Sequence, residues 1–347
     1  MYSINKNKKT ASVFIPHYGC KNDCVFCNQV KISGMDRKFD YESMKSGIIR
    51  DILSMKDGVD IEIAFFGGSF TAIDADVQES CLKIANDIRL KYGKDIQIKL
   101  STRPDAIDET VINRLIKYRV NTVELGVQSM DDEVLKASNR GHDSKSVYIA
   151  SDMIKKANIN LGHQIMVGLP MDSQQKLRDT MKKVIDIGPG IARIYPVLVI
   201  KDTELERMYR EGQYKPLSLE EAVKLSAFVY EQFENAGINV IRTGLQATEN
   251  IDLGKDVVAG PFHSAFGELV ISYIFKTKLE NWIRQDHIRG RKLKIKANKN
   301  YISKIIGNKK SNKVYFKKNY DVDLSIQAVD EDGIKVENGE IILPINL

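Results

Sequence analysis

Short apolar runs alternate along the chain with longer segments whose apolar residues recur every three or four positions. The short runs predict buried strands, and the periodic segments predict amphipathic helices. The expected strands are Ser12–Pro16, Ile61–Phe66, Ile96–Ser101, Thr122–Val127, Asn160–Val167 and Ala192–Ile200, with Asn239–Thr243 as a candidate seventh. The expected helices are Tyr41–Met55, Ala75–Tyr92, Glu109–Tyr118, Lys145–Ala157, Gln174–Ile187 and Leu219–Asn235. Such alternation is typical of a parallel sheet, so we expect an α/β protein built on a partial (β/α)6 barrel.

Polar residues and glycines gather where the expected strands end, which is the edge of a parallel barrel where chemistry collects. The runs are Gly67-Gly-Ser-Phe-Thr71, Ser101-Thr-Arg-Pro-Asp105 and Glu124-Leu-Gly-Val-Gln-Ser129. Gly67 and Gly68 allow the backbone to approach a ligand closely, although an ordinary strand–helix turn is the alternative. The guanidinium of Arg103 suits a carboxylate or a phosphate.

Glu124 and Gln128 are polar residues in an otherwise apolar strand, and their spacing places both on its inward face. A buried carboxylate needs partners, and ribose hydroxyls or an arginine would serve. An internal salt bridge with Arg193 is the alternative for Glu124. Gln164 is a further inward-facing candidate on the next strand.

Three cysteines, Cys20, Cys24 and Cys27, follow the first expected strand with the spacing C-x3-C-x2-C. Three thiolates from one loop can hold three corners of a [4Fe–4S] cluster and leave one iron without a protein ligand. A zinc site is the alternative, with His17 or Cys81 as fourth ligand. Cys81, however, lies on the apolar stripe of an expected helix and favours a core position.

The chain has 347 residues, which suggests about two domains. It has only four cysteines, no signal peptide and no apolar run long enough for a membrane span, so we expect a cytoplasmic protein without disulfides. The net charge of +6 is unevenly distributed. From Lys276 to Lys318, twelve lysines and three arginines face only Glu280 and Asp286, which gives +13 there and −7 elsewhere. A basic segment of this kind indicates nucleic-acid binding, with a solvated lysine-rich surface as the alternative.

The basic segment has its own pattern of elements. The expected order is strand, helix, turn, helix and strand, over Leu293–Ala297, Tyr301–Ile306, Gly307-Asn-Lys-Lys310, Asn312–Asn319 and Val322–Val329. This order resembles the core of a KH domain, which holds single-stranded RNA at a GxxG turn, although the second glycine is absent here. RNA contacts are therefore expected from Lys304, Gly307, Lys309, Lys310 and Lys313; a small lysine-rich lid is the alternative.

We expect three parts: a barrel over residues 1–250, a bridging segment or lid over 251–290, and the KH-like module over 291–347. The bridging segment contains His263, in a loop leading into an expected helix at Glu268–Lys278. A loop-capping role is the simpler interpretation of this histidine. The last stretch, Gly333–Leu347, predicts a hairpin around Asn338-Gly339.

Several of these runs together resemble a known family. They are the cysteine loop with Phe26 before Cys27, the three runs after the strands, Asn139-Arg-Gly-His142, Gly168-Leu-Pro170 and Ala192–Leu205. They resemble the radical S-adenosylmethionine (radical SAM) enzymes, and in particular the catalytic subunit of Elongator and its bacterial relatives. The resemblance covers roughly residues 10–250.

The resemblance implies that Cys20, Cys24 and Cys27 hold a [4Fe–4S] cluster whose open iron chelates S-adenosylmethionine (SAM). SAM would be cleaved reductively to a 5′-deoxyadenosyl radical, with an electron from a protein such as flavodoxin or ferredoxin. The residues expected to bind SAM are Gly67, Gly68, Ser69, Arg103, Glu124, Gln128 and Gln164. Ser69 replaces the glutamate common at this position, so backbone carbonyls of the glycines would bind the SAM ammonium group.

Elongator-type enzymes modify the wobble uridine of transfer RNA, so a tRNA base is the expected substrate. The 97 residues after Asn250 show no glycine-rich loop suited to coenzyme A, which favours a relative without the acetyltransferase domain. Three alternatives remain: a radical SAM enzyme acting on a small molecule, an RNA-binding protein with a structural or sensing cluster, and a zinc protein.

Overall fold

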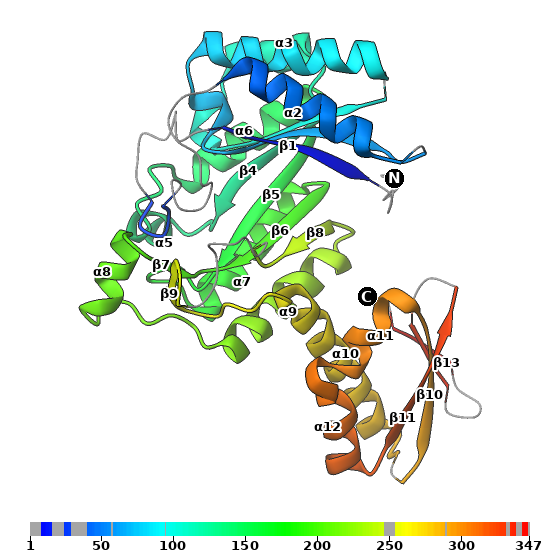
Figure 1. Cartoon of the computed structure of the whole chain (residues 1–347). Coiled ribbons are helices and arrows are strands. Elements are labelled where there is room, and N and C mark those ends of the chain that lie inside the picture. The colour runs from blue at the N-terminus through cyan, green and yellow to red at the C-terminus, as the bar shows by residue number, and fades with distance from the viewer. Residues whose placement is uncertain are drawn as a thin grey trace.

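Seven parallel strands form a sheet that curls into a half-barrel (Figure 1). The computed structural model describes residues 8–15, 24–28, 40–56, 58–93, 95–245, 254–288, 290–330, 334–337 and 342–345. The strands are β1 (Lys9–Ile15), β2 (Ile61–Gly67), β3 (Gln97–Thr102), β4 (Thr122–Gln128), β5 (Asn160–Val167), β6 (Ile191–Pro196) and β8 (Asn239–Thr243), in that order across the sheet. The expected partial barrel and its candidate seventh strand are confirmed.

The expected strand at Ala192–Ile200 is wrong in its second half. The chain leaves the barrel after Pro196, and β7 (Val199–Ile200) pairs antiparallel with β9 (Val257–Ala259). This two-stranded ribbon carries the segment before the C-terminal helices back to the carboxyl edge of the sheet. Both strands are too short to show a period in the sequence.

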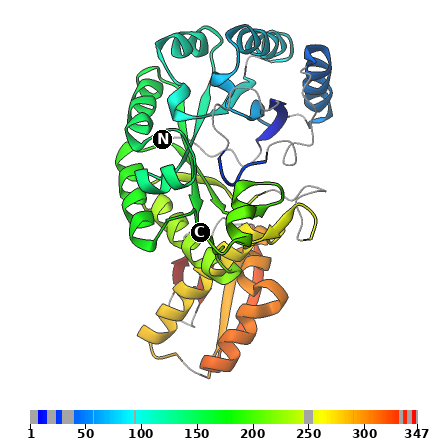
Figure 2. The ribbon, with the colours of Figure 1, turned by 90° about the vertical axis from the view of Figure 1, so that its left-hand side faces the viewer.

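Helices cover the outer face of the sheet, as Figure 2 shows. They are α2 (Tyr41–Ser54), α3 (Ala75–Tyr92), α4 (Glu109–Lys117), α6 (Ser144–Lys156), α7 (Gln174–Ile187) and α9 (Leu219–Asn235), and all six were expected. At five of them, α3 excepted, the N-cap side chain accepts hydrogen bonds from free backbone N–H groups; in α9 Ser218 and Glu221 do so reciprocally as a capping box. Cys81 is fully buried on α3, as expected for a core residue.

Two short helices, α5 (Asp132–Ala137) and α8 (Glu204–Arg210), were not expected. Their N-cap residues, Asp131 and Thr203, accept hydrogen bonds from the backbone N–H groups of Val134 and Glu206. These capping residues were the available sequence signal. Both helices lie beside the cysteine loop at the carboxyl edge of the sheet.

The long helix α10 (Phe266–Gln285) extends well past its expected end at Lys278 and takes part in two cores. Phe266, Val270 and Ile274 pack against α9. Farther along, Phe275 and Leu279 belong to the core of the C-terminal module. This helix therefore connects the half-barrel to the module through continuous packing (Figure 1).

The C-terminal module has the expected strand–helix–helix–strand order. The elements are β10 (Lys292–Asn298), α11 (Ile302–Ile306), α12 (Ser311–Tyr320) and β11 (Asp323–Val329), and the two strands are parallel neighbours. The two strands of the expected hairpin follow as β12 (Ile334–Glu337) and β13 (Ile342–Ile345), which pair antiparallel; its turn at Asn338-Gly339 lies outside the described residues. Among the described helices, none combines the length and apolar character needed to cross a membrane.

Candidate functional site

The described part of the cysteine loop, Cys24–Asn28, lies at the carboxyl edge of the half-barrel. Its backbone is held on two sides, because Val25 N–H donates to Ser138 O at 3.2 Å and Val25 O accepts from Leu205 N–H at 2.7 Å. Cys24 is 8% exposed, and Cys27 is half-buried. Cys20 lies outside the described residues.

An apolar cluster supports this loop. Val25 packs with residues from β5, β6, α5 and α8, and Phe26 lies against the same cluster; the other members include Val134, Met166, Leu169, Tyr195, Val197 and Leu205. Such a base excludes water from beneath the cysteines. The packing of Val25 and Phe26 in this cluster also fixes the loop at the edge of the sheet.

Arg140 joins the cysteine loop to the sheet. Its Nη1 donates to Cys24 Sγ at 3.2 Å, and its Nη2 donates to the carbonyl of Gly126 on β4 at 2.7 Å. Hydrogen bonds to ligand sulfurs are one means by which proteins tune iron–sulfur clusters. Arg140 was absent from the expected site residues, although it belongs to the run Asn139-Arg-Gly-His142 that contributed to the family resemblance.

A glycine makes room for this arrangement. A Cβ atom on Gly126 would lie 3.0 Å from Gln128 Nε2 and 3.1 Å from Arg140 Nη2. Gln128 has a φ of 66° at an irregularity in the β4–β5 pairing, and Gln164 Nε2 donates to its Oε1 at 3.4 Å. The structure thus brings Gln128 and Gln164 together near Arg140.

The Gly67–Ser69 turn reaches the same edge. Gly67 has a φ of 107°, and a Cβ atom there would lie 2.4 Å from the carbonyl oxygen of Ile15. Only glycine permits this approach of β2 to the last residue of β1, which leads toward the cysteines. Gly68 N–H donates to Ile15 O at 3.4 Å, and Ser69 is buried.

Arg103 is buried at the end of β3 and pairs with Asp105 in its own loop. Its Nε and Nη2 donate to the two carboxylate oxygens at 2.9 and 3.0 Å. The charges of both residues also act on His142, whose pKa is lowered to about 4 mainly by burial and then by Arg140. Arg103, Arg140 and His142 therefore belong to one electrostatic neighbourhood.

Glu124 lies in a separate chain of buried charges inside the half-barrel. Its Oε2 is 2.8 Å from Arg193 Nε, so the internal salt bridge considered as the alternative is confirmed. Lys99 Nζ lies 3.0 Å from both Glu124 Oε1 and Glu62 Oε1, and Lys8 also pairs with Glu62. Lys99 was not among the expected site residues. Its position in the middle of an otherwise apolar strand was the sequence signal that could have identified it.

Burial and ion pairing shift the pKa values of these buried charged groups in opposite directions. Burial alone would raise the pKa of Glu62, but Lys99 and Lys8 outweigh it, so the pKa lies below its usual value. Burial would likewise lower the pKa of Arg193, but Glu124 and Tyr195 raise it overall. The ion pairs therefore keep these groups charged inside the protein.

The basic turn of the C-terminal module projects two lysines into solvent. Lys309 and Lys310 are exposed and have φ values of 51° and 64°. The buried Asn312 side chain anchors the turn, because its Nδ2 donates to the carbonyls of Ser272 on α10 and Ile305 on α11 at 3.2 and 3.1 Å.

The remaining residues expected to contact RNA surround this turn. Gly307 has a φ of 79°, and a Cβ atom there would lie 2.4 Å from Ser311 Oγ. Lys313 is half-buried, and Lys304 Nζ lies 4.9 Å above the Tyr301 ring. Asn308 Nδ2 is 3.4 Å from His263 Nε2, which places the turn beside the loop that leads into α10.

The donor set at the carboxyl edge fits an iron–sulfur cluster with an amino-acid-like ligand. Cys24 and Cys27 offer sulfur, and Arg140 and the glycine turns offer N–H donors and close backbone approach. Cys81 takes no part, because it is fully buried on α3, where burial raises its thiol pKa to about 12. A zinc site that uses Cys81 is therefore ruled out by its position.

The sequence matches the Radical SAM superfamily over residues 14–184 and the Radical_SAM C-terminal domain over residues 189–276. It is 30% identical over 239 residues to the tRNA uridine(34) acetyltransferase of Methanocaldococcus infernus, covering 63% of this chain and 43% of that protein. It is 26% identical over 210 residues to Elongator complex protein 3 of Saccharomyces cerevisiae, covering 55% of this chain and 38% of that protein. The chain thus spans less than half the length of these curated relatives.

The solved structure of archaeal Methanocaldococcus infernus Elp3 with an N-terminal deletion has a similar fold. The TM-score is 0.61 at 25% identity, covering 79% of this chain and 64% of that one. This chain therefore belongs to the radical SAM superfamily, and its cofactors are the [4Fe–4S] cluster and SAM that members of the superfamily use.

Proposed function

We propose that this protein is a radical SAM enzyme that modifies a base in RNA, most specifically in tRNA. The observation that carries the proposal is the attachment of the cysteine loop to the carboxyl edge of the half-barrel through Arg140. The curated relatives support the substrate, because the one from Methanocaldococcus infernus is named for a tRNA uridine.

In this proposal Cys20, Cys24 and Cys27 hold the cluster. When bound, the cluster and SAM supply a carbon radical that abstracts hydrogen from a substrate C–H bond. Backbone groups of Gly67, Gly68 and Ser69 face the SAM amino group, while Gln128 and Gln164 offer amides to its ribose. A reduced flavodoxin or ferredoxin is the proposed electron donor.

The two arginines at this edge suit the SAM carboxylate. Arg140 contacts Cys24 Sγ directly, whereas Arg103 pairs with Asp105. We assign the carboxylate contact to Arg140 and a supporting role to Arg103. We leave Glu124 outside the proposed contacts with SAM, because Lys99 and Arg193 pair with its two oxygens.

The RNA-contacting part of the proposal is the C-terminal module. Residues 1–250 form the catalytic unit, residues 251–290 bridge it to residues 291–347, and the Gly307–Lys310 turn contacts phosphates. Support comes from the exposure of Lys309 and Lys310 and from the excess of lysine around them. Lys304 and Lys313 flank this turn.

The direct test uses tRNA from a strain that lacks this gene. The anaerobically reconstituted protein is incubated with that tRNA, SAM and reduced flavodoxin, and the tRNA is digested for nucleoside mass spectrometry. One nucleoside should change mass with the wild-type protein and stay unchanged with Cys24→Ala. Cleavage of SAM without any altered nucleoside would reject an RNA substrate and favour a small molecule.

A further inference from the structure

A cavity of about 860 Å³ lies inside the curled sheet, at the amino ends of the strands and therefore at the opposite end from the cysteine loop. The first residues of five strands line it: Gln97, Thr122, Asn160, Ile191 and Asn239. Cavities that take small organic ligands typically measure roughly 300–1,000 Å³, so this one is large enough.

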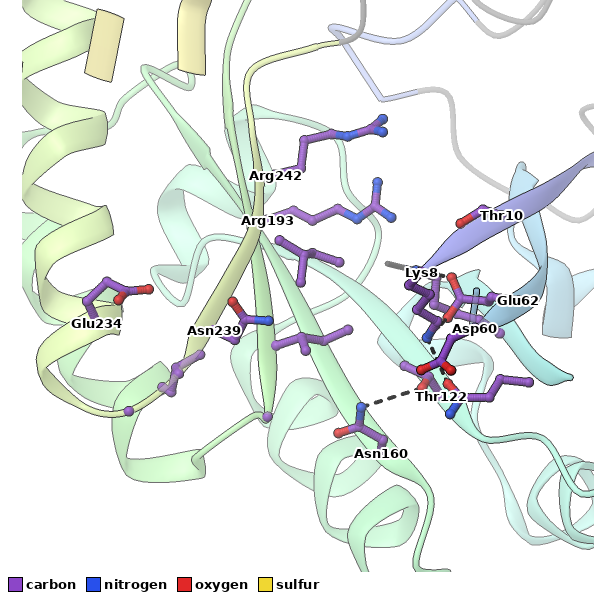
Figure 3. A pocket seen from close by; sticks show the side chains of 17 residues that line it. Lys8, Thr10, Asp60, Glu62, Thr122, Asn160, Arg193, Glu234, Asn239 and Arg242 are labelled. Atoms are coloured by element: carbon purple, nitrogen blue, oxygen red, sulfur yellow. Dashed lines mark hydrogen bonds and ion pairs between the residues drawn. The ribbon is translucent and has the colours of Figure 1, made fainter. Parts of the chain in front are cut away.

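Two arginines extend into this cavity from neighbouring strands. Arg193 on β6 and Arg242 on β8 are register partners in the parallel sheet, and Figure 3 shows both side chains reaching into the cavity. Like charges at directly opposed positions of adjacent strands are destabilising. An anion bound beside both guanidinium groups would relieve this repulsion.

The protein compensates only one of the two charges. Arg193 pairs with Glu124, but Glu124 is shared with Lys99, and Lys99 shares Glu62 with Lys8. This series of ion pairs contains three cations and only two carboxylates. Arg242 is exposed and forms no ion pair or hydrogen bond with any residue that the structure describes.

The other acidic side chains of the lining do not neutralise this wall. Asp60 lies across the cavity near Lys8 and Thr122, and Glu234 stands on the far side of β8 (Figure 3). The uncompensated positive charge of this wall therefore lies at Arg242, beside the paired Arg193. Neutral polar groups, among them Thr10 and Asn239, line the space around them.

We propose that this cavity binds a small molecule through an oxyanion group, a carboxylate or a phosphate, held by Arg242 and Arg193. The planar guanidinium suits both groups, because each presents two oxygens to its paired N–H donors. The polar side chains at the strand starts would bind the remainder of the molecule. The site goes beyond the proposed reaction with RNA and does not depend on it.

Isothermal titration calorimetry on the full chain tests this proposal without SAM, RNA or reductant. The two probes are malonate, which carries carboxylates, and inorganic pyrophosphate, in a buffer free of other polyvalent anions. At least one probe should bind saturably to the wild-type protein. Arg242→Gln should weaken that binding about tenfold or more, because it removes a charge-assisted contact. Arg242→Lys keeps the positive charge but loses the paired N–H donors of the guanidinium, so it should give an intermediate loss of affinity.

Arg50→Gln, on the outer helix α2, is the matched control and should bind like the wild type. Stronger binding of malonate than of pyrophosphate would identify a carboxylate site, and the reverse order would identify a phosphate site. The proposal is overturned if neither probe binds saturably, or if Arg242→Gln binds as tightly as Arg50→Gln. A thermal melt of each variant ensures that folded proteins are compared.

Discussion

The Nη1 atom of Arg140 donates a hydrogen bond to Cys24 Sγ at 3.2 Å, across 116 positions of sequence. The same guanidinium donates to Gly126 O at 2.7 Å. One side chain therefore joins the cysteine loop, strand β4 and the segment after α5. The position of Cys24 consequently depends on the half-barrel and not only on its own loop.

Cys24→Ala should abolish SAM cleavage without unfolding the protein. The substitution removes a cluster ligand, whereas the apolar base formed by Val25 and its neighbours stays in place. Iron content and 5′-deoxyadenosine yield would be measured after anaerobic reconstitution. Cys81→Ala is the control and should retain both, because Cys81 lies in the core at α3; full activity in Cys24→Ala would refute the cluster assignment.

Gly126→Ala should lower the rate of SAM cleavage about tenfold, because displacing a positioning group by a fraction of an ångström weakens catalysis. The new Cβ would press on Gln128 Nε2 and Arg140 Nη2 at 3.0 and 3.1 Å. Gly47→Ala, within helix α2, is the control; it should leave the rate unchanged and raise helix stability by about 0.5–1 kcal/mol. Equal cleavage rates in the two variants would mean that SAM cleavage does not depend on the exact position of Arg140.

Lys99→Met should destabilise the fold by roughly 1–3 kcal/mol, because two buried carboxylates each lose one of their two ion-pair partners. Glu62 and Glu124 both lie 3.0 Å from the lost ammonium group. The free energy of unfolding would be measured in urea. Lys156→Met breaks an exposed pair with Asp152 and should cost at most about 0.5 kcal/mol. Similar losses in both variants would show that the buried chain contributes little.

Stability should fall as the pH is lowered below about 6.5, in part because of His163. Burial, with a smaller effect of Lys155, lowers its pKa from 6.5 to about 3. Between these values the unfolded chain binds a proton that the folded protein does not, so acid favours unfolding. One such group contributes about 1.4 kcal/mol per pH unit.

His163→Gln should make the pH dependence of unfolding shallower between pH 6.5 and 4. His287→Asn, at an exposed position, should leave it unchanged. Urea unfolding at a series of pH values measures both. An unchanged slope in His163→Gln would indicate that His163 is protonated in the folded protein.

Lys309→Glu combined with Lys310→Glu should weaken tRNA binding about tenfold or more at low salt. Both lysines are exposed at the turn, and fewer phosphate contacts should also reduce the dependence of affinity on salt. SAM cleavage without RNA should be unaffected. Lys83→Glu with Lys156→Glu, on the outer helices of the barrel, is the charge-matched control; equal tRNA affinity in the two double variants would exclude the turn as an RNA contact.

The sequence allowed the half-barrel to be predicted because each strand–helix unit carries its own periodicity and turn residues. It also placed Gly67, Arg103 and Gln128 at one edge, since carboxyl ends of parallel strands converge. The short helices α5 and α8 were missed because six or seven residues hold too few apolar positions to show a period.

The partners of individual side chains could not be predicted in the same way. Arg140 and Cys24, or Lys99 and Glu62, meet only after distant strands assemble, and no local pattern specifies such a pair. Glu124 illustrates the point, because its spacing fits both a ligand contact and a salt bridge. The observed distance of 2.8 Å to Arg193 establishes the salt bridge, and for that reason we leave Glu124 outside the proposed contacts with SAM.

The most direct test of the whole proposal is the yield of 5′-deoxyadenosine from the anaerobically reconstituted protein, SAM and reductant, with and without tRNA from a strain lacking this gene. We predict that the wild-type protein forms this product and that the tRNA increases its yield. A yield that tRNA leaves unchanged would contradict the RNA substrate, and the absence of product would contradict the catalytic function itself.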